Sequence, residues 1–393
     1  MRPAHLLTST LDLPCGVVLK NRLAKSAMSD VDGEGAPTEA QIRLYRQWAD
    51  GGLGLAIIGE VQGDPSKAEK PGNLVLRDDV DAQLFRRLAE AGATDKAQLW
   101  LQLGHAGALA HPPISRPAGP SALDLGSLKC AALSLVEIER LPSDFARTAR
   151  LAKQLGFGGV QIHAAHGFLL SQFLSPLFNK REDHYCGSIA NRLRLTLETL
   201  AAVREEVGSG YPIGLKLNAT DGLQGGLTEE DALRGVAALD ATSVDLIEIS
   251  GGTYFPGAPS SSEADRRGPY FLDFARKARL LTSKPLMLTG GVKTYEQAME
   301  VRSAGIDLIG LARALVLDPS LPTSWLAGER RAPAFPRFHA PPEGGVTAWY
   351  TMRLTELAEG RDLSGPERLP EAIRAYEARD AARVAVWTNR FRS

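Results

Sequence analysis

Two short runs, PLMLTGG at residues 285–291 and DLIGLAR at residues 307–313, give the strongest indication of the fold. Each is an apolar run that ends on Gly or Ala, and residues 294–304 between them have a helical pattern that stops at Gly305. Near-continuous apolar strands that alternate with helices are typical of parallel strands covered by helices. The two runs therefore predict consecutive strand–helix units of an α/β fold.

The same unit recurs along the chain before these two runs. Eight such units predict a single closed (β/α)8 TIM barrel. An open, doubly wound sheet is the alternative, but no Gly-x-Gly-x-x-Gly motif follows an early strand. The expected strands are residues 23–28, 53–60, 98–103, 159–163, 213–218, 245–250, 285–289 and 307–312, and the clearest helices are residues 38–50, 188–207, 228–239 and 294–304.

Two segments interrupt this rhythm. Residues 106–141 are long and rich in Pro, Gly and Ser, which predicts a functional lid or a small excursion from the barrel. From residue 332 the barrel pattern stops, and helices are expected around residues 346–359 and 370–386. We therefore predict a barrel over residues 1–331 and a C-terminal helical extension over residues 332–393 that packs on it, with a homodimer through the extension as one possibility.

Composition excludes several classes of protein. The 393 residues are 44% hydrophobic, and 45 basic residues nearly balance 46 acidic ones, so no field suited to nucleic acid or an anionic membrane is expected. Apolar runs fall short of the roughly 18–20 residues of a spanning helix, and the first residues lack a secretory pattern, so we expect a cytoplasmic protein. Cys15, Cys130 and Cys186 are scattered, which argues against a disulfide framework or an iron–sulfur cluster.

Polar residues gather where the predicted strands end, which is the face that carries function in TIM barrels. Gly290-Gly291 and Ala312-Arg313 follow the last two strands, where small residues let backbone approach a phosphate and an arginine can bind it. The remaining members of this ring are Ser26, Ser29, Asp30, Glu60, Gln102, His105, His163, His166, Lys216, Asn218, Asp221, Ser250, Thr253, Tyr254 and Thr289.

His163 and His166 stand at the end of one predicted strand. A metal site is not predicted, because two histidines are too few and no Cys or carboxylate follows at ligand spacing. Two imidazole N–H groups aimed at one oxygen would instead stabilise a developing enolate or nitronate. The pair therefore predicts a site that polarises an oxygen of a small-molecule substrate.

Five blocks of this sequence resemble the Old Yellow Enzyme family of FMN-dependent NAD(P)H:flavin oxidoreductases, in its branch without an iron–sulfur domain. The third block is long and specific, and the five together span nearly the whole predicted barrel. They are LKNRLAKSAMSD (19–30), LQLGHAG (101–107), IHAAHGFLLSQFLSPLFNKREDHYCGSIANR (162–192), LTGGVKT (288–294) and DLIGLARALVLDP (307–319).

The resemblance implies a role for each matching residue. His163 and His166 would bind and polarise the substrate's carbonyl or nitro oxygen, and Lys216 would favour the reduced, anionic flavin. Gly290, Gly291, Ala312 and Arg313 would hold the FMN phosphate. The flavin ring would contact Ala27, Met28, Ser29, Gly59 and Gln102.

The implied reaction is hydride transfer from NADPH or NADH through FMN to an activated alkene such as an α,β-unsaturated carbonyl compound. Phe168 stands where most relatives carry the tyrosine that protonates the substrate, so water, Tyr254, Tyr270 or Tyr350 would have to supply the proton. Without any donor, the alternative is a redox-neutral isomerase or a specialised biosynthetic enzyme. Ala108 stands where relatives often have Arg, which predicts a wider or less polar pocket. A flavin-binding barrel without catalysis is the remaining alternative, and the intact His pair argues against it.

Overall fold

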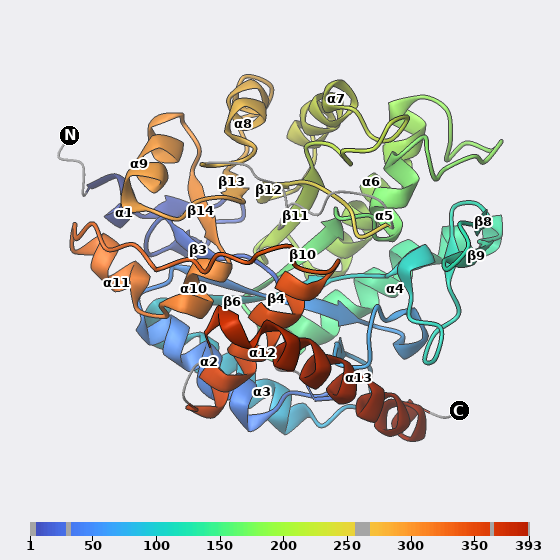
Figure 1. Cartoon of the computed structure of the whole chain (residues 1–393). Helices are drawn as coiled ribbons and strands as arrows, with labels where there is room; N and C mark the ends of the chain where they lie inside the picture. The colour runs from blue at the N-terminus through green and yellow to red at the C-terminus, as the bar shows by residue number, and fades with distance from the viewer. Residues whose placement is uncertain (1–4, 29–32, 256–267, 362–364, 392–393) are drawn as a thin grey trace.

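The computed structural model describes residues 5–28, 33–255, 268–361 and 365–391. Eight parallel strands close into a barrel in the order β3-β14-β13-β12-β11-β10-β6-β4, and β4 pairs with β3 to complete the ring. The predicted TIM barrel is therefore confirmed, and Figure 1 shows the helices arranged around the strands. The barrel strands are β3 (Leu23–Lys25), β4 (Leu55–Gln62), β6 (Gln98–Leu103), β10 (Gly159–Ala164), β11 (Ile213–Asn218), β12 (Leu246–Ser250), β13 (Leu286–Thr289) and β14 (Leu308–Leu311).

The outer helices begin where the sequence supplies a capping side chain. The hydroxyl of Thr38 accepts a hydrogen bond from the backbone N–H of Gln41, and Ser188 and Thr228 cap their helices in the same way. Thr294 forms a capping box with Gln297. The helices of the barrel and its connections are α1 (His5–Thr8), α2 (Glu39–Asp50), α3 (Ala82–Gly92), α4 (Leu135–Gln154), α5 (Leu169–Leu174), α6 (Ile189–Val207), α7 (Glu229–Asp240), α8 (Leu272–Arg279), α9 (Tyr295–Ser303), α10 (Arg313–Leu317) and α11 (Leu321–Leu326).

A short hairpin closes the end of the barrel where the strands begin. Strands β1 (Leu11–Asp12) and β2 (Val18–Leu19) pair antiparallel, and their buried Leu11 and Leu19 belong to one apolar cluster with inward-facing barrel residues such as Trp100. This plug leaves the opposite end, where the strands finish, as the open mouth. Minor strands and turns are β5 (Leu74–Val75), β7 (Ala118–Gly119), β8 (Leu123–Asp124), β9 (Lys129–Ala132), η1 (Pro65–Lys67), η2 (Thr94–Lys96), η3 (Gly107–Leu109) and η4 (Pro366–Arg368).

Several boundaries differ from the sequence prediction, and two of these differences affect the description of the barrel mouth and its connections. β3 ends at Lys25, three residues early, because the chain leaves the ladder there and residues 26–28 line the barrel mouth instead. The long segment 106–141 is an excursion with its own three-stranded sheet, and its last residues already belong to α4, which starts at Leu135. Pro142 lies within the second turn of α4 without ending it.

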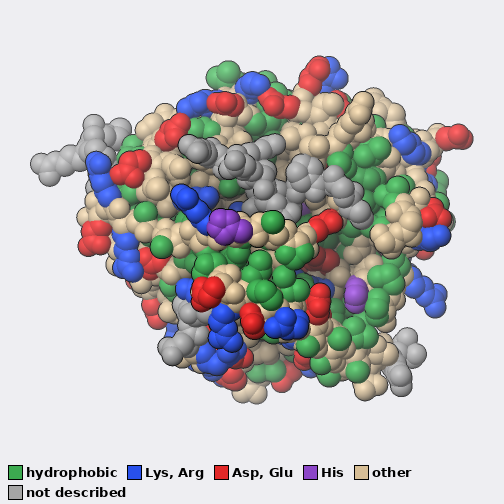
Figure 2. Space-filling model, viewed as in Figure 1, with side chains coloured by type: hydrophobic (Ala, Val, Ile, Leu, Met, Phe, Trp, Pro, Cys, Tyr) green, Lys and Arg blue, Asp and Glu red, His purple; other side chains and the backbone are tan. Residues whose placement is uncertain are grey.

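The C-terminal extension forms α12 (Gly345–Glu359) and α13 (Leu369–Phe391). α12 lies against α2, where Arg43 donates a hydrogen bond to the carbonyl of Ala358. α13 continues across the segment that precedes α2, where Arg390 donates to the carbonyl of Glu34. Figure 1 shows α12 (orange-red) beside α2 and α13 (dark red) running on from it toward the C-terminus, and Figure 2 shows apolar and charged side chains intermixed over them. No helix among the described ranges has the length and apolarity needed to cross a membrane. The homodimer stays a prediction.

Trp387 anchors α13, because its side chain is 1% exposed and packs against Ala68 and Val75. We expect Trp387→Ala to lower the free energy of unfolding by about 3–5 kcal/mol, as for other buried aromatic truncations. Val386→Ala is the matched control, because Val386 is exposed on the same helix and should change stability little. Urea unfolding of both variants checks this, and equal stabilities would mean that α13 is not docked through Trp387.

Candidate active site

The residues to which the resemblance gives a cofactor or substrate role all line one pocket at the mouth of the barrel, where they fall in the described ranges. The pocket encloses about 1290 Å³, open space at its mouth included. Ser29 falls outside the described residues. The predicted residues that meet in the pocket are Ala27, Met28, Gly59, Gln102, His163, His166, Phe168, Lys216, Gly290, Gly291, Ala312 and Arg313.

The floor of the pocket is a buried polar network centred on the carboxylate of Glu248. Its Oε1 lies 3.0 Å from the Lys216 ammonium and accepts hydrogen bonds from the hydroxyls of Ser26 and Thr289. Its Oε2 accepts from the amide of Gln161 at 2.7 Å. Lys216 and Glu248 are neighbours in the β11–β12 register, which places both side chains inside the barrel.

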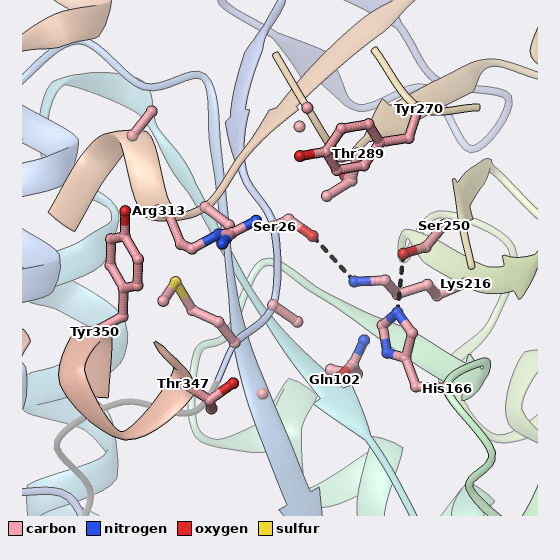
Figure 3. Close-up of a pocket in the computed structure, with 18 of the residues that line it drawn as sticks. Ser26, Gln102, His166, Lys216, Ser250, Tyr270, Thr289, Arg313, Thr347 and Tyr350 are labelled. Carbon is pink, nitrogen blue, oxygen red and sulfur yellow. Dashed lines mark hydrogen bonds between the residues drawn. The ribbon is translucent and has the colours of Figure 1, made fainter. Parts of the chain in front are cut away.

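The network extends to Gln102, whose amide donates to the side-chain carbonyl of Gln161 at 2.7 Å. Burial alone raises the pKa of the Glu248 carboxyl, but Lys216 and the hydrogen bonds from Ser26, Thr289 and Gln161 lower it overall. The carboxylate therefore stays ionised and fixes the Lys216 side chain. Figure 3 shows Lys216 directed toward Ser26.

His163 and His166 form a hydrogen-bonded chain on one side of this floor. Nδ1 of His163 shares a hydrogen bond with Glu60, its Nε2 lies 3.2 Å from Nδ1 of His166, and Nε2 of His166 lies 2.9 Å from Ser250 Oγ. The backbone N–H of His166 donates to Asn218 Oδ1, which holds the residue at a φ of +61°. Such a φ is uncommon for a residue with a side chain, and it turns the ring toward His163.

Both imidazoles are neutral near pH 7. Burial lowers the pKa of His163 to about 3, and the Lys216 charge adds to this effect. Desolvation, Lys216 and His163 lower the pKa of His166 well below its ordinary value. The pair therefore presents neutral N–H donors rather than cations to anything bound above Lys216.

Cationic and backbone groups form the other end of the pocket. Arg313 lies 5.4 Å from the ring of Tyr350 on α12. Burial lowers the pKa of Lys293, and the nearby charge of Arg313 lowers it further. Gly290 and Gly291 both have positive φ values, of 118° and 81°, which favour glycine. Figure 3 shows Arg313 and Tyr350 on one side of the pocket and Lys216 and His166 on the other. This end has the donors that a phosphate needs.

Gly59 leaves room between the two ends of the pocket. A Cβ at Gly59 would lie 2.8 Å from Ala27 Cβ and 2.9 Å from Gln102 Oε1, so only glycine fits between these two predicted flavin contacts. The pocket thus brings together an arginine and two glycines at one end, the amide of Gln102 and the ammonium of Lys216, which are groups that fit the phosphate and the ring of FMN.

Two aromatic residues flank the His pair. The buried ring of Phe168 lies 4.8 Å from that of His163, and it has no proton to donate. Tyr254, which is about half exposed, also lines the pocket, with its ring 5.7 Å from Phe168 and 5.9 Å from His166. Ala108 packs instead in an apolar cluster with Phe178 and Phe255, so its small side chain does not widen the pocket as predicted.

Some predicted members of the ring lie elsewhere. His105 lines a separate groove with Lys67, and its Nδ1 accepts a hydrogen bond from the backbone of Gly107. Asn218 and Asp221 are hydrogen-bonded to each other behind His166. Asp30 falls outside the described residues. Among the residues that the structure does describe, His, Cys, Asp and Glu form no group of three arranged to hold a metal ion.

The sequence reasoning missed two sets of residues. Glu248 is a charged residue inside the apolar run DLIEIS, a signal that would have identified it as an internal partner for Lys216. The roof of the pocket had no sequence signal, because it comes from the extension and a loop that approach only in the fold. Its members are Glu69, Phe335, Val346, Thr347, Tyr350 and Thr351, of which only Tyr350 was predicted near the site.

The sequence profile of the NADH:flavin oxidoreductase / NADH oxidase family matches residues 14–329, which is most of the chain. The chain belongs to this family. The predicted resemblance to Old Yellow Enzyme is therefore confirmed, and so is the assignment as an oxidoreductase that uses FMN and a nicotinamide co-substrate.

Two of the curated relatives are fungal NADH-dependent flavin oxidoreductases. The NADH-dependent flavin oxidoreductase iliE of Neonectria sp. (strain DH2) is 35% identical and matches 86% of this chain but only 49% of its own length. The iliE protein of Hypocrea jecorina (strain QM6a) is 33% identical over 79% of this chain and 86% of its own. The chain thus spans about half the length of the first relative and most of the second.

Solved structures share the fold. A 2-naphthoyl-CoA reductase complex superposes with a TM-score of 0.77 at 26% identity, over 83% of this chain and 53% of the other. An Old Yellow Enzyme homologue from Zymomonas mobilis gives a TM-score of 0.72 at 23% identity, over 84% and 94% of the two chains. These likenesses extend across the barrel that carries the pocket.

The Glu248 carboxylate should be essential to the stability of the barrel. We expect Glu248→Ala to lower the free energy of unfolding by about 3–5 kcal/mol, because it leaves the buried Lys216 ammonium without a counter-charge. Glu230→Ala, which breaks an exposed ion pair with Arg234, is the control and should change little. Chemical denaturation measures both, and a Glu248→Ala protein as stable as the control would contradict the network described above.

Proposed function

We propose that this protein reduces activated alkenes, such as α,β-unsaturated carbonyl compounds, with electrons taken from NADH. Bound FMN supplies the chemistry of accepting a hydride from the nicotinamide and passing it to the alkene. The observation that carries the proposal is the His163–His166 pair, held neutral and turned toward one point beside the position that we propose for the flavin ring, between Gln102 and Lys216. We propose NADH rather than NADPH as the electron donor because the two fungal relatives are named as NADH-dependent.

We assign the cofactor contacts from the shape of the pocket. Gly290, Gly291, Ala312 and Arg313 would hold the phosphate. Ala27, Met28, Gly59, Gln102 and Lys216 would meet the isoalloxazine, and Ser29 keeps its predicted place beside it. Lys216 shares its charge with Glu248, so its effect on the flavin is smaller than that of an unpaired cation.

The His pair acts on the substrate oxygen. As the alkene accepts a hydride at its β-carbon, negative charge develops on the carbonyl oxygen, and N–H donors from His163 and His166 stabilise that charge. Because both rings lie in a buried site, these donors need no reorganisation when the charge appears. The same geometry would suit a nitro oxygen.

We assign the proton donor to Tyr254. Phe168 cannot donate a proton, and Tyr254 lies beside both Phe168 and His166 at the pocket. Burial raises the pKa of Tyr254 to about 12, so its hydroxyl is protonated at neutral pH and can donate a proton to the substrate's α-carbon. Tyr270 and Tyr350 lie at the end that carries Gly291 and Arg313, away from the His pair. Redox-neutral isomerisation is the outcome expected only if no group delivers this proton.

The purified protein should be yellow, should bleach on anaerobic mixing with NADH, and should reoxidise with 2-cyclohexen-1-one or maleimide. The reduced product then accumulates in step with NADH consumption. Failure of both NADH and NADPH to bleach the flavin would contradict the proposal, and rearranged substrate without NADH consumption would support the isomerase instead.

Arg313→Ala should weaken FMN binding about 10- to 100-fold, because a charge-assisted contact to the phosphate is lost. Flavin fluorescence on titration of the apoprotein measures this. Arg330→Ala is the matched control, since Arg330 is exposed and paired with Glu296. Equal FMN affinities in the two variants would place the phosphate elsewhere.

Tyr254→Phe should slow net alkene reduction about 10²- to 10⁴-fold, which is the usual contribution of a positioned acid. Flavin bleaching by NADH should be preserved, because the tyrosine acts only on the alkene. Phe168→Tyr in the same background should restore the rate, since it puts a hydroxyl beside the same pocket. A Tyr254→Phe enzyme with unchanged reoxidation by enones would assign the proton to water or another group.

A further inference from the structure

Glu60 is the one ionisable group that is hydrogen-bonded directly to the His pair among the residues the structure describes. It lies in β4, is 6% exposed, and its carboxyl packs against the backbone of Gly104, where any Cβ would lie within 2.8 Å of it. Oε2 of Glu60 accepts a hydrogen bond from the amide of Gln62 at 2.9 Å, and Oε1 faces Nδ1 of His163. The carboxyl is therefore fixed in orientation, with one oxygen committed to each neighbour.

The protonation state of Glu60 determines which nitrogen of His163 carries the hydrogen. A neutral imidazole has one N–H and one lone pair. If Glu60 is ionised, Nδ1 must donate to it, and Nε2 then presents a lone pair to the pocket. If Glu60 carries a proton, it donates to Nδ1, and Nε2 becomes an N–H donor. Only the second arrangement lets His163 donate a hydrogen bond to a substrate oxygen.

The tautomer of His166 is not fixed by a neighbouring carboxyl group. Its Nε2 faces the hydroxyl of Ser250, which can donate or accept by rotating. When Ser250 donates, Nδ1 of His166 carries the hydrogen and faces the same point as Nε2 of His163, 3.2 Å away. A substrate oxygen beside these two nitrogens can then receive two hydrogen bonds, provided that His163 has the right tautomer.

We propose that Glu60 is a positioning residue that carries a proton in the active enzyme and thereby makes His163 a hydrogen-bond donor to the substrate. The inference rests on the proposed function of the His pair, and it adds that the protonation state of Glu60 decides whether His163 can donate to the substrate. Loss of the Glu60 proton reverses the His163 tautomer and leaves a lone pair against the substrate oxygen.

The surroundings of Glu60 support a proton at neutral pH. Burial raises the pKa of Glu60 to about 8, against the lowering effects of Lys70, the Gln62 hydrogen bond and Lys216. Glu69 also faces it and favours the protonated form, and Tyr254 and His163 are the other titratable neighbours. His163 does not compete for the proton as a cation, because burial lowers its pKa to about 3. Since the Glu60 pKa is raised, the donor state is present below about pH 8 and is lost as pH rises.

Glu60→Gln tests the proposal because glutamine mimics the protonated acid permanently. Its carbonyl can accept from Gln62 while its amide donates to Nδ1 of His163, so it fits both contacts of the native side chain. We expect wild-type kcat for enone reduction to fall about 10²-fold across an alkaline limb near pH 8, as for loss of one donor to a developing oxyanion. Glu60→Gln should lack this limb, whereas Glu69→Gln, a second pocket carboxyl, should still show it.

Binding provides a readout that is independent of turnover. The oxidised holoenzyme is titrated with 2-cyclohexen-1-one, which has no ionisable group, and the flavin spectrum reports the Kd. We expect the wild-type Kd to weaken roughly 3- to 10-fold between pH 7 and 9.5, and the Glu60→Gln Kd to stay constant. Imidazole ¹⁵N shifts of His163 in the wild-type protein should show Nε2–H at pH 7 and Nδ1–H at pH 9.5, which keeps the test open if the variant fails to fold.

Two results would overturn the proposal. One is an alkaline limb that persists in Glu60→Gln, and the other is a His163 tautomer that does not change with pH in the wild type. A wild-type enzyme that neither bleaches with NADH nor binds the enone would instead contradict the proposed function, so the two failures are distinguishable.

Discussion

The carboxylate of Glu248 lies inside the barrel and joins groups from strands that are far apart in the sequence. It pairs with Lys216 from β11, accepts from Thr289 at the end of β13 and from Ser26 after β3, and reaches Gln102 in β6 through Gln161 in β10. A buried charge is tolerated only when it is paired and hydrogen-bonded, so these partners are constrained in place together. The rest of the site is built on this floor.

Three features of the pocket follow from that constraint. Lys216 and Gln102 reach the pocket at fixed positions because their side chains belong to the network. His163 neighbours Lys216 in the β10–β11 register, so the His pair begins one strand from the same ion pair. Burial is the main cause of the lowered pKa of both imidazoles, and the Lys216 charge lowers it further, which keeps them neutral donors. The floor therefore sets the geometry of the groups above it and contributes to their protonation.

Much of this could be predicted from the sequence, because parallel barrel strands are apolar runs and their ends carry the polar groups. Gly290-Gly291 and Arg313 were placed correctly because they follow strands that the apolar pattern identifies without ambiguity. The roof was not predictable, since Val346 and Thr347 reach the pocket only through the docking of α12 on α2. The sequence predicts a lid or a small excursion for segment 106–141 but not its strands, because these are two to four residues long, too short for a periodic pattern.

Glu60 shows a second reason why part of the site could not be predicted from the sequence. Its position at the end of a predicted strand was apparent, but its bond to His163 depends on β4 and β10 flanking β6, so that inward-pointing side chains of these two strands meet inside the barrel. The sequence shows that Glu60 is able to titrate. The hydrogen bond that links its protonation to the tautomer of His163 is visible only in the three-dimensional structure.

We expect an electron-poor substrate to bind through one oxygen to His163 and His166 above the flavin. A crystal structure of the FMN-bound protein with a phenol such as 4-hydroxybenzaldehyde would test this expectation. We expect the phenol oxygen about 2.7–3.2 Å from both His163 Nε2 and His166 Nδ1, with the ring stacked on a flavin that contacts Gln102 and Lys216. A flavin bound away from Gln102, or a phenol oxygen that contacts neither histidine, would contradict the account.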